Sequence, residues 1–337
     1  MAKLVLGIGT SHGSMLSTPP REWDGRAAAD RRNPALAFRG GFYSFDQLHA
    51  LRKTDDFAAR NTIDARQAHF DRCQKQLDAL GAILAAAEPD VLLIIGDDQH
   101  EWFTEALQPT FGVYCGEQVI NFAPKPEEIA RHTREGRGPS IAGNHPPVDQ
   151  PYPIAKALAE SVIAQAMSDG FDVAAIMAQP KDGAETKNLG HAYGFIYRRL
   201  LLDRAVPLIP VLVNTFYPPN QPSPRRCFDF GRAIGRAIVR WDSDARVVVV
   251  GSGGLSHFVI DEDFDHRMLD AFARDDIAAI TGEDDALFRS GTSETKNWIV
   301  ARGVLAETGF RMTLLDYVPC YRSEAGTGNA MAFATWS

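Results

Sequence analysis

Three histidines share one sequence context, in which an apolar run is followed by a glycine, a few small or polar residues and then the histidine. They are His12 in LVLGIGTSH, His100 in VLLIIGDDQH and His257 in VVVVGSGGLSH. Histidine binds transition metals through its neutral ring and exchanges protons near neutral pH. A lone histidine usually does neither, but three in the same position relative to a strand predict one shared site.

A metal site is one chemistry that these residues can support. Two imidazoles and one carboxylate with three open positions form the facial triad of non-haem Fe(II) oxygenases. The residues alone leave open which histidine is not a ligand. Asp97 and Asp98 lie so close to His100 that all three cannot turn to one metal. Glu294 is the better acid, because it follows a capping-type sequence and opens a predicted helix, although a glutamate there more often complements the helix dipole.

Other chemistries use similar residues. The Gly-Ser-Gly-Gly turn before His257 can form a phosphate nest, but neither a GxGxxG fingerprint nor a Walker lysine accompanies it. Zinc accepts two histidines and a glutamate as readily as iron does. A zinc-dependent hydrolase and a non-catalytic protein with the same fold therefore remain alternatives.

The elements that must position these residues are short apolar strands alternating with helices. Strands are predicted at 4–9, 91–96, 110–114, 172–178, 208–214 and 247–250. Helices are predicted at 61–87, 153–169, 190–204, 226–240, 263–281 and 294–308. This alternation predicts an α/β fold with a central, mostly parallel sheet, helices on both faces and the active site at the strand carboxyl ends.

The site residues are spread along most of the sequence, from His12 to Glu294. We therefore expect residues 1–337 to form a single catalytic domain. Two stretches rich in proline and glycine, at about 17–56 and 123–152, predict long irregular loop insertions. Loops of this length often serve as lids or interface arms.

Composition excludes several classes of protein. The 35 Lys and Arg against 43 Asp and Glu give a net charge of −8, and no basic run is present, which argues against nucleic-acid binding. No apolar stretch approaches the roughly 20 residues of a membrane span. The amino terminus enters a strand-like run at once, without a signal-peptide pattern, so we expect a cytoplasmic protein. The four cysteines include no Cys-x-x-Cys pair and are expected to be free thiols.

Taken in order, these motifs resemble the class III (LigB-type) extradiol ring-cleavage dioxygenases, the family of the protocatechuate 4,5-dioxygenase β subunit. The matching segments are GTSH, GDDQH, GHAYGF, VNTFYPP, GSGGLSH and SETKNW. The long interval between His12 and His100 is similar to that of the family's gallate and 3-O-methylgallate dioxygenases. The resemblance covers nearly the whole chain.

The resemblance implies a role for each motif residue. His12, His100 and Glu294 would bind Fe(II), His257 would be the catalytic acid/base, and His191 would be a catalytic second-sphere residue near substrate or oxygen. The implied reaction is extradiol (meta) ring cleavage of a protocatechuate-, gallate- or 3-O-methylgallate-like catechol with O₂. It belongs to the catabolism of aromatic, lignin-derived compounds. Family members usually form homodimers or larger homo-oligomers.

An aromatic acid brings a carboxylate that needs a cationic or donor-rich partner when it leaves water. We rank Arg322 and Thr327 first among the candidates, because their glycine-containing loop could bring backbone donors close. Tyr217 and Ser256 complete the expected substrate-binding set, since both lie in matching motifs.

Overall fold

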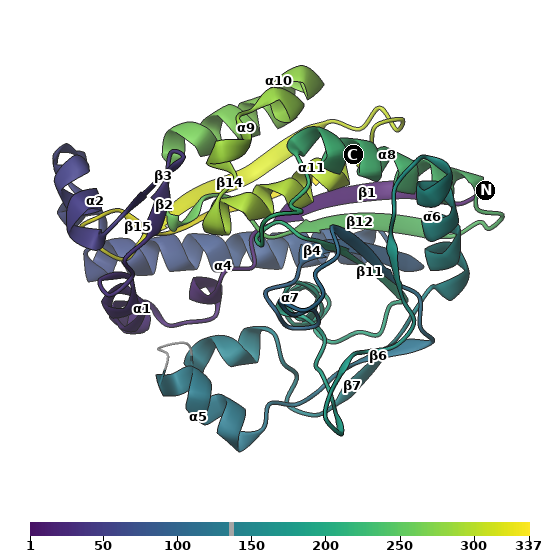
Figure 1. Cartoon of the computed structure of the whole chain (residues 1–337), viewed down its shortest axis with the longest axis horizontal. Coiled ribbons are helices and arrows are strands. Elements are labelled where there is room, and N and C mark those ends of the chain that lie inside the picture. The colour runs from purple at the N-terminus through teal and green to yellow at the C-terminus, as the bar shows by residue number, and fades with distance from the viewer. Residues whose placement is uncertain (135–137) are drawn as a thin grey trace.

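In the computed structural model, which describes residues 1–134 and 138–337, nine strands form the main sheet (Figure 1). Their order is β13-β15-β1-β12-β4-β11-β5-β8, and β14 pairs with β15. The bounds are β1 Lys3–Thr10, β4 Val91–Asp97, β5 Phe111–Tyr114, β8 Ala174–Ile176, β11 Leu208–Val213, β12 Arg246–Ser252, β13 His257–Val259, β14 Met312–Tyr321 and β15 Thr327–Trp336.

Parallel pairing joins the central strands β1, β12, β4 and β11. The carboxyl ends of these strands therefore lie at one edge of the sheet, which is where an α/β protein places its ligands. Antiparallel strands flank this centre, with β5 beside β11 and β15 beside β1. The predicted α/β fold with a mostly parallel central sheet is confirmed.

Helices cover both faces of the sheet. Alternate residues of β4 point to opposite faces, so that Leu93 and Ile95 belong to one hydrophobic cluster and Leu92 and Ile94 to the other. The main covering helices are α4 Ile63–Ala86, α6 Lys156–Ser168, α7 His191–Arg199, α8 Pro224–Arg240, α9 Glu262–Arg274, α10 Ile277–Gly282 and α11 Thr295–Val304. The predicted two-sided covering is confirmed.

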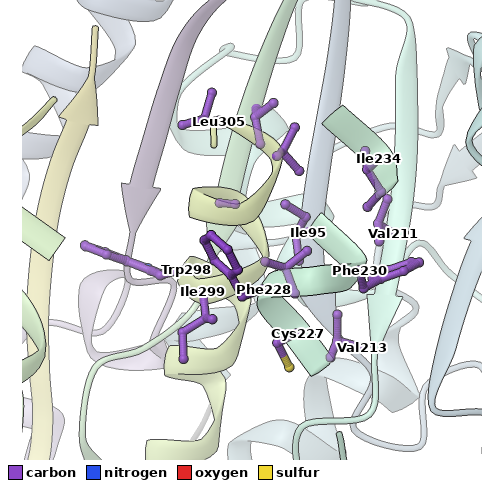
Figure 2. Close-up of a cluster of buried hydrophobic side chains, with 14 of the residues drawn as sticks. Ile95, Val211, Val213, Cys227, Phe228, Phe230, Ile234, Trp298, Ile299 and Leu305 are labelled. Atoms are coloured by element: carbon purple, nitrogen blue, oxygen red, sulfur yellow. The ribbon is translucent and has the colours of Figure 1, made fainter. Parts of the chain in front are cut away.

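Helix α11 is buried along its whole length. It packs against the sheet and α8, where Trp298 and Ile299 lie in one apolar cluster with Phe230 and Ile234 (Figure 2). A helix that is enclosed on all sides cannot shift without opening the core. The residue that precedes it, Glu294, is therefore held on a rigid support.

The expectation of irregular structure at 17–56 is wrong. This segment contains α1 (Trp23–Asp30), the hairpin strands β2 (Leu36–Phe38) and β3 (Gly41–Tyr43), and α2 (Phe45–Leu51). The hairpin turn uses Arg39 and Gly40, both at positive φ, which is the backbone that a tight two-residue turn requires. The turn formers therefore separate short elements. A single turn of helix, α3 (Phe57–Arg60), follows before α4.

The second stretch, 123–152, is also partly regular. It contains α5 (Pro126–Arg134) and most of β7 (Gln150–Pro153), which pairs with β6 (Gln118–Asn121). Residues 135–137 of this stretch lie outside the described residues. One further small ladder, β9 (Lys181–Asp182) with β10 (Glu185–Thr186), precedes α7.

The strands β13, β14 and β15 were not expected. The predicted helix at 263–281 is also divided, because Asp275 has a φ of 58° between α9 and α10. Within the described ranges, no helix has the length and apolar character needed to cross a membrane.

Candidate metal and acid/base site

Neighbouring parallel strands bring three chain segments together at their carboxyl ends. Thr10 of β1 lies opposite Ser252 of β12, and β12 pairs on its other side with β4, which ends at Asp97. His12 follows β1 by two residues. The parallel register thus places His12, Ser252 and Asp97 near one another at the strand ends.

Four side chains converge beyond these strand ends. Within residues 1–134 and 138–337, His12, Asp97, His191 and Glu294 form a group whose possible ligand atoms all lie within 4.8 Å of one another. The Nε2 atom of His12 is 3.3 Å from a Glu294 oxygen and 4.0 Å from Asp97 Oδ1. A mixed set of imidazoles and carboxylates is suited to a divalent transition metal.

Hydrogen bonds assign the tautomers of the three site histidines. Ser252 Oγ donates to Ala192 O at 2.7 Å, so it accepts from Nδ1 of His12 at 3.0 Å. His191 Nδ1 lies 2.8 Å from the Glu101 carboxylate, and His257 Nδ1 lies 2.9 Å from the Leu255 carbonyl. Because these oxygens can only accept, each Nδ1 carries the proton.

The Nε2 lone pair is therefore the free functional atom of each neutral ring. For His12 and His257 this atom faces the Glu294 carboxylate, at 3.3 and 3.1 Å respectively. A lone pair and a carboxylate oxygen cannot bond to each other, so a proton or a metal cation must lie between them. The donor set thus fits a bound cation.

Asp97 gives a second, independent indication of a cation. It is buried, and its Oδ1 atom has no hydrogen-bond partner. Gln99 donates to the other Asp97 oxygen at 3.3 Å and to Glu294 Oε1 at 3.0 Å. Two buried carboxylates at one point need either protons on the neighbouring groups or a cation to offset their charge, and a divalent metal ion would meet this need.

The pKa values of the site reflect this concentration of charge. Burial raises the pKa of Asp97, and the nearby Glu294 adds to that effect. Burial also opposes ionisation of Glu294, but His257 and His12 outweigh it and hold its pKa well below the ordinary value. Burial disfavours the charged form of His191, yet Glu101 raises the pKa of that ring to about 10. A metal would compete with these protons for the same nitrogens.

The Gly-Ser-Gly-Gly turn serves the carboxylate, which argues against the phosphate-nest alternative. Gly253 has a φ of +118°, and a β-carbon there would lie 2.8 Å from Glu294 Oε2. The backbone N–H of Gly254 donates to the same oxygen at 3.3 Å. These glycines allow the turn to approach Glu294 closely.

Four of the predicted chemical residues lie at this centre: His12, Glu294, His191 and His257. His191 lies closer to the centre than a second-sphere role implies, since it belongs to the ligand group. The structure does not bring His100 into that group. The His100 ring stacks on Tyr217, with ring centroids 3.7 Å apart and planes 4° from parallel.

Three of the four residues expected to bind substrate have partners inside the protein. Arg322 is buried and makes a two-pronged ion pair with Asp30, at 2.7 and 2.9 Å, and Thr327 donates to the same carboxylate at 2.6 Å. Ser256 donates to the buried Asp265 at 2.6 Å. These partners hold the three side chains within the protein, and a substrate-binding role for them stays a prediction. Tyr217 is partly exposed beside His100.

The sequence argument missed Asp97 as a member of the group, and it missed Gln99 and Glu101 altogether. All three belong to one run, GDDQHE, which closes β4. Its density of polar residues directly after a fully buried strand was the available signal, because buried polar side chains there need partners or a ligand.

Gly291 marks the tight packing around His257. A β-carbon on Gly291 would overlap the His257 ring and its carbonyl oxygen. We expect Gly291→Ala to lower the free energy of unfolding by about 1–3 kcal/mol, because the core must shift to accept the methyl group. Urea unfolding measures this loss. Gly282→Ala is the matched control, since no atom lies within 4 Å of its β-carbon. Equal stability of the two variants would contradict this packing.

Comparison with known proteins connects this geometry to a family. A family model described as "Catalytic LigB subunit of aromatic ring-opening dioxygenase" matches residues 61–327. This range includes Asp97, His191, His257 and Glu294, and it leaves out His12.

Individual relatives carry related names. The chain is 30% identical over 188 residues to a 2,3-dihydroxyphenylpropionate/2,3-dihydroxicinnamic acid 1,2-dioxygenase of Mycobacterium sp. (strain MCS), covering 54% of this chain and 50% of the relative. A protein of the same name from Cupriavidus necator is 25% identical, covering 69% and 81%. Gallate dioxygenase of Pseudomonas putida is 27% identical, covering 52% and 51%. The chain thus spans about half the length of several curated relatives that it matches.

Proposed function

We propose that this chain, which belongs to the family of catalytic LigB subunits of aromatic ring-opening dioxygenases, cleaves a catecholic aromatic acid with O₂ in an Fe(II)-dependent extradiol reaction. Extradiol cleavage opens the ring beside the two hydroxyl-bearing carbons. The observation that carries the proposal is the convergence of free Nε2 atoms and two buried carboxylates on one point.

His12 and Glu294 would hold the metal in this proposal. Both are buried, and each is fixed by a neighbour: Ser252 orients the His12 ring, and the Gly253–Gly254 turn encloses Glu294. Bound Fe(II) would supply a common site for catechol and O₂ and lower the pKa of the catechol hydroxyls. The chain contributes by holding the reactants in register, which replaces a chance encounter with an oriented one.

His257 is the proposed acid/base. Its Nδ1–H donates a hydrogen bond to the Leu255 carbonyl. Nε2 is therefore the atom that accepts a proton, and this atom faces the site. The ring can take a proton from a substrate hydroxyl and later return it as the ring opens, since imidazole works in both directions near neutral pH. Burial keeps bulk water from competing for that proton.

The substrate class is proposed from the relatives and the site. The names of the relatives specify catechols that bear a carboxylate, either on a propionate or cinnamate side chain or on the ring as in gallate. Tyr217 and His100 offer a stacked, partly exposed aromatic surface suited to a flat ring. The protocatechuate, gallate and 3-O-methylgallate assignments, the homo-oligomeric assembly and the cytoplasmic location stay predictions.

The test is O₂ uptake by protein purified without oxygen and loaded with Fe(II). The substrates are protocatechuate, gallate, 3-O-methylgallate, 2,3-dihydroxyphenylpropionate and a catechol that lacks a carboxylate. We expect O₂ uptake and a ring-opened product with at least one of the acids, and a lower kcat/KM with plain catechol. Metal-dependent hydrolysis supported by Zn(II), with no O₂ uptake on any catechol, would replace the proposal with the hydrolase alternative.

A further inference from the structure

We propose that His191, oriented by Glu101, completes the metal site with His12 and Glu294, and that His100 stays outside it. This inference rests on the proposed metal-dependent function and concerns the identity of the ligands. It departs from the assignment suggested by the motif order, in which His100 was the second imidazole.

The position of His191 carries the first step. Its ring lies edge-on to that of His12, with ring centroids 4.6 Å apart and planes at 81°. The two histidines reach this point from different elements, His12 from the end of β1 and His191 from the first turn of α7. Because His191 Nδ1–H donates a hydrogen bond to Glu101, the atom left to bind a metal is Nε2. Two imidazoles and the Glu294 carboxylate would then supply the donor set of a facial triad.

Glu101 carries the second step, as a positioning residue. One of its oxygens accepts from the backbone N–H of His191 at 2.8 Å, and the other accepts from Nδ1, also at 2.8 Å. Two bonds from one carboxylate fix both the backbone and the ring. A carboxylate behind a histidine ligand fixes its tautomer, orients it and makes it more basic. Glu101 comes from the polar run that closes β4.

The third observation is that the backbone conformation at His100 turns its ring away from the site. His100 has a φ of 60°, in the left-handed region, and its ring is stacked on Tyr217. The neighbouring Gln99 instead reaches Glu294. The end of β4 therefore presents Asp97 and Gln99 to the site, while the imidazole of His100 packs against Tyr217.

The experiment measures metal content and affinity, independently of turnover. Wild type, His191→Ala, His100→Ala and Glu101→Gln are loaded with Fe(II) or Co(II) without oxygen. Metal per chain is then determined by mass spectrometry, and Kd by competition with a chelator. Glu105→Gln is the matched control for Glu101, because Glu105 is an exposed glutamate in the same loop. Circular dichroism of the metal-free proteins checks that each variant folds.

We expect His191→Ala to raise Kd at least about 100-fold and Glu101→Gln about 10- to 100-fold, as is usual for a carboxylate behind a ligand. His100→Ala and Glu105→Gln should stay within about twofold of wild type, and only His191→Ala should change the visible spectrum of bound Co(II) strongly.

Loss of metal in His100→Ala, with metal retained in His191→Ala, would overturn the inference and leave the dioxygenase proposal standing. A wild-type protein that binds metal at His191 but takes up no O₂ would overturn the function and keep the ligand assignment. A wild type that binds no metal would overturn both.

Discussion

His257→Gln is expected to bind metal and catechol almost as the wild type does. Its kcat is expected to fall by a factor of about 10²–10⁴, the usual contribution of a positioned acid/base. Glutamine is chosen because Gly291 packs directly on the His257 ring and leaves no room for a larger group. The glutamine side chain cannot take and return a proton, so KM should change much less than kcat. Steady-state O₂ uptake and single-turnover product formation measure the loss.

The matched control is His49→Gln, which removes an exposed histidine of α2. Its kcat should equal that of the wild type. Retention of full activity by His257→Gln would remove His257 from the mechanism. Loss of bound metal in the same variant would instead assign it to the metal site.

Asp30→Ala is expected to lower the free energy of unfolding by about 3–5 kcal/mol, the usual cost of leaving one buried charge without its partner. Asp30 is buried and binds Arg322 through two hydrogen bonds, and it also accepts from Thr327. The ion pair ties α1 to the hairpin of β14 and β15. Urea unfolding, monitored by far-UV circular dichroism, measures the change.

Two further variants test the cause. Asp30→Ala combined with Arg322→Met removes both charges and should recover part of the loss, because neither charge is then left buried without its partner. Glu324→Ala breaks the neighbouring ion pair between Glu324 and Arg31. The side chain of Arg31 is 48% exposed and that of Glu324 is 40% exposed. That change should cost less than about 1 kcal/mol. Equal losses in Asp30→Ala and Glu324→Ala would contradict the proposed role of burial.

The strands that carry the site were predictable because each is a short, continuous apolar run with a glycine at its end. The continuous apolar runs at 91–96 and 247–250 predict strands that are buried on both faces, and both strands are buried in the sheet. In contrast, β15 reads TGNAMAFATW, which is rich in alanine and poor in β-branched residues. This strand is buried because other strands pair with it on both sides, and the strand propensity of its own residues does not indicate those neighbours.

The direction of side chains after a strand end was not predictable. Asp97 and His100 are three positions apart, yet one points into the site and the other stacks on Tyr217. A single left-handed residue decides this difference. Similarly, nothing local in the sequence indicates that Arg322 pairs with a carboxylate 292 positions away.

The position of β15 has a consequence for synthesis of the protein. This strand pairs with β1, and Trp336 lies opposite Gly7, 329 positions earlier in the sequence. Until the last ten residues of the strand leave the ribosome, the edge of β1 stays unpaired, and an exposed strand edge invites association with other chains. Pairing between two strands so far apart in the sequence is also slow, because the chain must close a long loop first. Nascent chains that stall before β15 is made would therefore be prone to aggregate.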